Sequence, residues 1–213
     1  MWRAAGRVTL RMAATQSDEI LDVLKRVAQV LREADIEFAL AGGLSAWVHG
    51  GPPTENDVDI LIREQDVDPA LAALDAAGLE TAKPPEGWLV KAWSDGVLID
   101  LMYEPSGVVV DDEFLERCEV HNVAAVRMHV MPLEDLLVGK LLALTEHNLD
   151  FAPILEHARA LREQVDWAHV ASRTEHSPFA RAFLYMLADL GIRTDEAESL
   201  SIRVRERRLR RVG

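Results

Sequence analysis

Apolar residues recur at helical spacing near the start of the chain and then gather into short runs. From Ser17 onward, an i, i+3, i+4, i+7 pattern predicts a helix with Ser17 as its N-cap. A short apolar run over residues 36–41 predicts a strand that ends at Gly42-Gly43, before one or two turns of helix over 44–49. The buried stripe of the first helix is expected to comprise Ile20, Leu21, Leu24, Val27, Ala28 and Leu31.

Strand signals dominate the next part of the chain. One helix is predicted over residues 69–77, where helical spacing resumes and Gly78 ends it. Short β-branched or apolar runs bounded by turn residues predict strands over 57–62, 89–93, 97–103, 108–110 and 126–131. The second and third of these would pair antiparallel across Ser94-Asp95-Gly96.

After Pro132 the pattern is helical throughout. Helices are predicted over residues 133–145, 151–163, 166–173, 178–190 and 198–211. Strands with interleaved helices, followed by helices alone, indicate an α/β (α+β) fold with a small mixed β-sheet, flanking helices and a helical C-terminal half. We expect a flexible N-terminal extension over 1–16, a catalytic core over 17–131 and a helical C-terminal domain over 132–213.

Composition narrows the class of protein. The chain has 213 residues, 49% of them hydrophobic and 28% charged, which is typical of a globular protein with a real core. No apolar run is long enough to span a bilayer, residues 1–16 lack the apolar segment of a secretory signal, and Cys118 is the single cysteine. We therefore expect a cytoplasmic protein with no membrane partner.

Charge is unevenly distributed along the chain. The formal net charge is −13, so the surface as a whole does not attract nucleic acid. Residues 203–213 nevertheless hold six arginines against Glu206, a local charge of +5. This segment is either a solvated tail or a basic edge for an anionic partner.

Gly42-Gly43-Leu44-Ser45 lies between the first predicted strand and a helix. Paired glycines allow the backbone to approach a ligand closely, and a helix start offers unpaired N–H groups. The turn could thus seat a phosphate, with a contact from the Ser45 hydroxyl. An ordinary turn is the alternative.

Three aspartates occupy predicted strands. Asp57 and Asp59 are two residues apart and project from one face of a strand whose other face is apolar. Asp100 lies between Ile99 and Leu101. Clustered carboxylates repel one another unless a cation lies between them, and oxygen ligands suit Mg²⁺. Solvated acids on an edge strand are the alternative.

Together these residues resemble the signature of the DNA polymerase β-type nucleotidyltransferase superfamily: Gly42-Gly43-Leu44-Ser45, about a dozen residues, then Asp57-Val58-Asp59. Within it, the chain is most similar to the bacterial AbiEii/MenT-like nucleotidyltransferase toxins. Asp100 matches the third carboxylate of the family. The resemblance implies that these three acids are catalytic and hold Mg²⁺, or Mn²⁺, and that Gly42, Gly43 and Ser45 bind the nucleotide.

The resemblance extends to about residue 150. Pro132-Leu133-Glu134-Asp135-Leu136 and Lys140 resemble a helix whose lysine is directed at the nucleotide phosphates, and Asp150 matches a later aspartate. Two arginines of the relatives are missing, since Pro52-Pro53-Thr54 contains none and His147 occupies the second position. These gaps point to an altered choice of nucleotide or acceptor, or to a weaker enzyme.

The implied reaction is transfer of an NMP from an NTP to an acceptor hydroxyl with release of pyrophosphate. The resemblance favours a tRNA 3′ end as acceptor and a toxin with a cognate antitoxin. A small-molecule or protein nucleotidyltransferase is the enzymatic alternative, and a catalytically silent nucleotide-binding module is the other. The seven histidines form no H-x-x-x-H pair, so no zinc hydrolase is indicated, and His49 is interpreted as a packing residue.

Overall fold

The computed structural model describes residues 3–54 and 57–193. It divides into two compact units at Pro132 and Leu133. The elements of the first unit are α1 (Arg3–Glu33), β1 (Ala39–Leu40), α2 (Gly42–Val48), β2 (Asp57–Leu61), η1 (Glu64–Asp66), α3 (Val67–Ala76), β3 (Glu80–Ala82), β4 (Leu89–Ser94), β5 (Val97–Met102), α4 (Asp112–Arg117), β6 (Glu119–Val123) and β7 (Val126–Val130).

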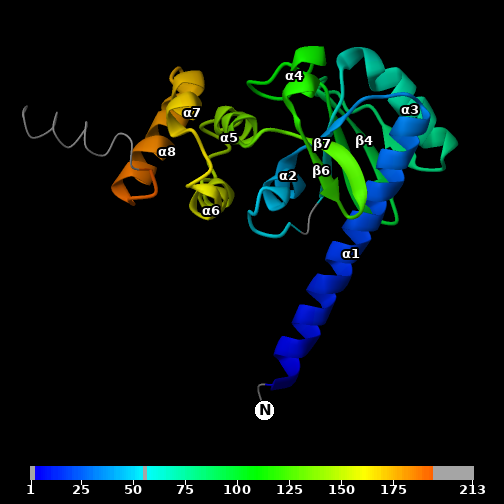
Figure 1. Cartoon of the computed structure of the whole chain (residues 1–213), viewed down its shortest axis with the longest axis horizontal. Coiled ribbons are helices and arrows are strands. Elements are labelled where there is room, and N and C mark those ends of the chain that lie inside the picture. The colour runs from blue at the N-terminus through cyan, green and yellow to red at the C-terminus, as the bar shows by residue number, and fades with distance from the viewer. Residues whose placement is uncertain (1–2, 55–56, 194–213) are drawn as a thin grey trace, which may run out of the picture. The chain divides into compact units, whose positions relative to one another are not determined.

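A seven-stranded mixed sheet forms the centre of the first unit (Figure 1). Its strand order is β3-β4-β5-β2-β1-β7-β6, in which β2 and β5 run parallel, as do β1 and β7, while the other pairs are antiparallel. The predicted mixed sheet with flanking helices is therefore confirmed, as is the hairpin of β4 and β5. The parallel pair β2–β5 brings together two strands that are far apart in the sequence.

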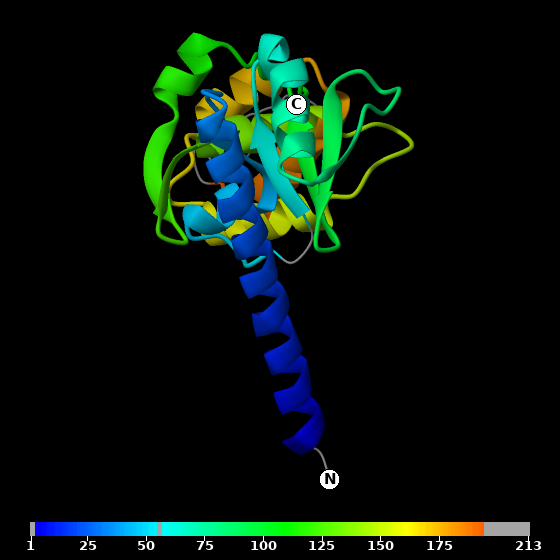
Figure 2. The ribbon, with the colours of Figure 1, turned by 90° about the vertical axis from the view of Figure 1, so that its right-hand side faces the viewer.

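Helices α1 and α3 pack on one face of this sheet, and Figure 2 shows α1 lying across it. Val58, Ile60 and Ile62 on β2 and just after it, and Ile99 and Leu101 on β5, are fully buried in this layer. Alternation along a strand then turns the intervening residues to the opposite face, which is where the aspartates lie.

Three predictions for the first unit need correction, and two strands were not predicted. Helix α1 begins at Arg3, so Ser17 lies within the helix and is not its N-cap. Residues such as Ala, Leu, Met and Arg favour helix before any apolar stripe appears. Only Ala39–Leu40 of the predicted 36–41 strand is paired, and residues 108–110 form no strand. The short polar strands β3 and β6 were not predicted.

The second unit is helical, with α5 (Leu133–Leu142), α6 (Ala152–Leu161), α7 (Trp167–Thr174) and α8 (Pro178–Asp189). These confirm four of the predicted helices. Asp166 and Ser177 accept hydrogen bonds from the backbone amides of the first turns of α7 and α8. The predicted helix over 198–211 and the arginine-rich segment lie outside the described residues. Among the helices that the structure describes, none is long and apolar enough to cross a membrane.

Candidate active site

Three aspartates converge on one face of the central sheet. In the parallel pair of β2 and β5, Asp59 and Asp100 are direct partners, and Asp57 lies two residues before Asp59 on the same face. One carboxylate oxygen from each residue lies within 4.8 Å of the others. Backbone pairing thus brings together acids that the sequence separates by some forty residues.

This carboxylate cluster is half-buried. The side chain of Asp100 is 15% exposed, and Asp57 and Asp59 are both partly covered. Three carboxylates this close repel one another, and partial burial strengthens the repulsion because less water screens it. Such a cluster is stabilised by cations, and its hard oxygen donors are those that a divalent ion such as Mg²⁺ prefers.

Lys91 supplies one such cation, and it was not predicted as a site residue. It is the direct partner of Asp100 in the β4–β5 hairpin, and its Nζ lies 2.8 Å from Asp100 Oδ1. The sequence did contain the signal. A two-residue loop at Asp95-Gly96 pairs Ser94 with Val97, and counting outward from that pair places Lys91 opposite Asp100.

Gly42, the first residue of α2, allows the start of this helix to approach the cluster. Its φ is +59°, and a Cβ atom added there would lie 1.7 Å from Asp59 Oδ2. Gly43 is also closely packed, because a Cβ atom added there would lie 2.6 Å from Thr54 Oγ1. Both glycines therefore pack directly against the neighbouring side chains, and the backbone after β1 borders the carboxylates.

Ser45 lies one turn further into α2 and is fully buried. Its hydroxyl donates a hydrogen bond of 3.0 Å to the carbonyl of Gly42. The side chain thus holds the glycine loop in shape. To donate to a phosphate instead, the hydroxyl would have to give up this bond.

Lys140 and Asp150 belong to the second unit. Lys140 is half-buried near the end of α5, where its positive charge acts on His157 of α6. Asp150 is exposed, and its carboxylate accepts a hydrogen bond of 3.0 Å from the amide of Ala152 at the start of α6. The structure gives Asp150 a capping role and brings Lys140 beside a histidine.

Solved structures with a similar fold include two of ANT(2″)-Ia. The solution structure of this antibiotic-resistance factor has a TM-score of 0.56 at 12% identity, covering 84% of this chain and 96% of that one. Its crystal structure in complex with adenylyl-2″-tobramycin has a TM-score of 0.53 at 13% identity, covering 76% and 95%. A tRNA nucleotidyltransferase complexed with a primer tRNA and an ATP analogue has a TM-score of 0.37 at 16% identity, covering 78% and 51%.

At 12% and 13% identity, the similarity to the two ANT(2″)-Ia structures establishes a shared fold. None of the curated protein sequences matches the chain. A family model described as "Uncharacterised nucleotidyltransferase" matches residues 3–190, which include every strand of the sheet and all three aspartates. The chain therefore belongs to this nucleotidyltransferase family.

Proposed function

We propose that this nucleotidyltransferase moves an NMP from an NTP to an acceptor hydroxyl at Asp57, Asp59 and Asp100. The observation that carries the proposal is the convergence of three carboxylate oxygens within 4.8 Å on adjacent parallel strands. A cluster of this kind disfavours folding unless a cation is bound. Gly42 and Gly43, which have no side chains, bring the backbone at the start of α2 directly against Asp59 and Thr54.

The donor set fits Mg²⁺, with Mn²⁺ as an alternative, because all three side chains offer oxygen. Asp57, Asp59 and Asp100 would hold the ion. When bound, it would neutralise charge on the triphosphate of the NTP.

The reaction balances without a covalent enzyme intermediate. The acceptor oxygen forms a bond to the α-phosphorus, the bond from that phosphorus to the α,β-bridging oxygen breaks, and pyrophosphate leaves. Asp100 would take the proton of the acceptor hydroxyl, or share a second ion that readies it. The backbone of Gly43, the Ser45 hydroxyl and Lys140 would bind the phosphates, and Asp150 is a further nucleotide contact that we propose.

For the acceptor we propose an RNA 3′ end, in particular that of a tRNA. The support is the resemblance of the Gly-Gly and Asp-x-Asp motifs to AbiEii/MenT-like toxins. In that case the protein would be a cytoplasmic toxin with a cognate antitoxin. Basic residues in 203–211 would supply phosphate contacts, and RNA binding would weaken steeply with salt.

A cationic small-molecule hydroxyl is the second candidate acceptor. The net charge of −13 favours it, because an acidic surface attracts a polyamine-like antibiotic and repels RNA. The fold shared with ANT(2″)-Ia is compatible with this choice.

The test is incubation of the full chain and Mg²⁺ with each α-³²P-labelled NTP and, separately, total tRNA, aminoglycosides and total protein. We expect label in one acceptor class, and no label with Asp57→Asn or Asp59→Asn. Glu116→Gln, an exposed carboxylate on α4, is the matched control and should keep full transfer. Wild-type levels of transfer in Asp59→Asn would refute the site. Label on aminoglycosides alone would replace the tRNA proposal with the second candidate.

A further inference from the structure

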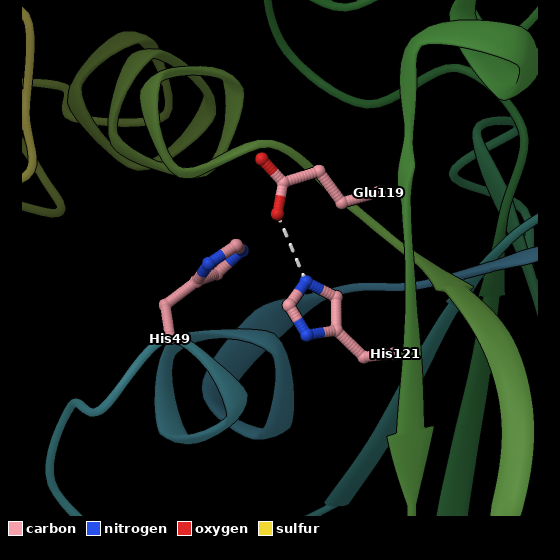
Figure 3. A group of neighbouring side chains, drawn as sticks. All are labelled: His49, Glu119 and His121. Atoms are coloured by element: carbon pink, nitrogen blue, oxygen red, sulfur yellow. Dashed lines mark hydrogen bonds and ion pairs between the residues drawn. The ribbon is translucent and has the colours of Figure 1, made fainter.

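A second cluster of side chains that can bind a metal lies away from the aspartates, at the β6 edge of the sheet. It consists of His49, Glu119 and His121 (Figure 3). Strand β6, which carries two of them, is separated from β2 by β1 and β7. At a strand spacing of about 4.8 Å, β6 therefore lies roughly 14 Å from β2. The two clusters are distinct sites.

Two short elements bring the three side chains together. Glu119 and His121 are two residues apart on β6 and project from the same face, with His121 Nε2 3.0 Å from Glu119 Oε2. His49 ends helix α2, and its ring meets that of His121 edge-on, with centroids 5.6 Å apart. One ring nitrogen of each histidine and one carboxylate oxygen lie within 4.8 Å of one another.

A backbone carbonyl sets the tautomer of His49. Its Nε2 lies 3.0 Å from the carbonyl oxygen of Met131, which can only accept, so Nε2 carries a proton. Met131 is itself held in place, because its amide donates to the carbonyl of Leu40 at 2.8 Å. Histidines that ligate metals usually donate their second ring nitrogen to a carbonyl or carboxylate in this way.

We propose that His49, Glu119 and His121 bind a divalent transition-metal ion of the Zn²⁺ class, with water completing the coordination. Bonds of about 2.0–2.1 Å at tetrahedral angles separate ligand atoms by roughly 3.3 Å. The distance of 3.0 Å between His121 Nε2 and Glu119 Oε2 is already close to this value. Glu119 can adjust, since its side chain is 69% exposed. A Zn²⁺ ion would displace the proton between His121 and Glu119.

The ligand chemistry separates this site from the aspartate cluster. Imidazole nitrogen suits Zn²⁺ and related ions, whereas the all-oxygen cluster suits Mg²⁺ or Mn²⁺. A bound ion would tie the end of α2, the helix that begins with Gly42 and Gly43, to edge strand β6. The inference does not depend on the proposed acceptor or on nucleotidyl transfer.

The test is Zn²⁺ titration of the metal-free full chain by calorimetry, with X-ray absorption of the loaded protein. We expect one Zn²⁺ site with imidazole scattering that persists in Asp59→Asn. The affinity should fall by more than about 100-fold in His121→Asn, because loss of an outer-shell partner alone costs about 10- to 100-fold. The exposed variant Glu119→Gln, which leaves the fold least disturbed, should also weaken binding.

His129→Gln is the matched control, because His129 pairs with Val120 on the same hairpin but lies outside the cluster. It should bind Zn²⁺ as the wild type does. Equal affinity in wild type, His121→Asn and Glu119→Gln would overturn the proposal. So would Zn²⁺ binding that is lost in Asp59→Asn and shows only oxygen ligands.

Discussion

Gly42 and Asp59 are packed so closely that a Cβ atom on the glycine would lie 1.7 Å from Oδ2 of the aspartate. The same glycine has a φ of +59°, which side chains rarely adopt. Glycine is therefore required here for two reasons. The positive φ disfavours any side chain, and a Cβ atom would collide with the carboxylate of Asp59. Close approach of the start of α2 to the three aspartates is a property of this single residue.

Gly42→Ala should abolish nucleotidyl transfer, because the methyl group must push Asp59 away from the other two carboxylates. It should also lower the free energy of unfolding, of which about 1–2 kcal/mol is backbone strain. Radiolabel transfer and Mn²⁺ titration measure the first effect, and denaturant unfolding the second.

Gly96→Ala is the matched control for this substitution. Gly96 also has a positive φ, +82°, but no atom lies within 4 Å of its Cβ position. It should show the strain without loss of Mn²⁺ affinity. Equal loss of Mn²⁺ affinity in both variants would mean that the clash with Asp59 is not the cause.

Lys91 Nζ lies 2.8 Å from Asp100 Oδ1, so it would compete with the proposed divalent ion for this carboxylate. Removing its charge in Lys91→Gln should raise Mn²⁺ affinity by roughly five- to tenfold, equivalent to about 1 kcal/mol. Electron paramagnetic resonance of free Mn²⁺ measures this directly. Lys91→Arg keeps the charge and should stay close to the wild type. Weaker Mn²⁺ binding in Lys91→Gln would instead make Lys91 a support for the metal-bound state.

Asp135 and Arg173 form an ion pair that joins α5 to α7. Asp135 is 1% exposed, so a variant without the guanidinium leaves a charge in the interior of the second unit. Arg173→Ala should cost about 3 kcal/mol of unfolding free energy. The double variant Asp135→Leu/Arg173→Leu should cost less, since it removes both charges. A larger cost in the double variant would contradict this explanation.

His157 should make the second unit sensitive to acid. Burial, and secondly the positive charge of Lys140, hold its pKa below the ordinary 6.5, and its Nδ1 has no hydrogen-bond partner among the described residues. As the pH decreases below about 6.5, His157 binds a proton in the unfolded chain but not in the folded chain. The free energy of unfolding therefore falls as the pH decreases.

His157→Leu should remove this part of the pH dependence. The difference in unfolding free energy between variant and wild type should therefore grow in favour of the variant between about pH 7.5 and pH 5.5. His147→Leu, whose side chain is 89% exposed in the wild type, is the control and should follow the wild-type curve. A difference that does not change with pH would show that His157 has the same pKa in the folded and the unfolded chain, and would contradict this explanation.

Local patterns were sufficient to predict much of the face that carries the aspartates. Alternation along β2 predicted that Asp57 and Asp59 share a face and that Val58 and Ile60 lie in the core, because strand period depends only on neighbouring residues. The pairing of Asp59 with Asp100 follows from a parallel alignment of two strands. No sequence period encodes that alignment, so it required the structure.

Long-range proximity also explains what was missed. His49 lies at the end of a helix, whereas Glu119 and His121 lie on an edge strand that was not predicted. No spacing in the sequence therefore indicated that the three residues lie close together. The start of α1 was missed for the opposite reason. Its first turns follow intrinsic helix propensity without the apolar stripe that marks the rest.

The alignment of Asp59 with Asp100 depends on backbone pairing and not on the chain between them. Insertions or deletions in the turns around α3 and β3 would leave this pairing unchanged. A single residue added inside β5 would instead rotate Asp100 into the layer of Ile99 and Leu101. The length of the segments around α3 and β3 can therefore change during evolution without separating Asp59 from Asp100. The number of residues within β2 and β5 cannot.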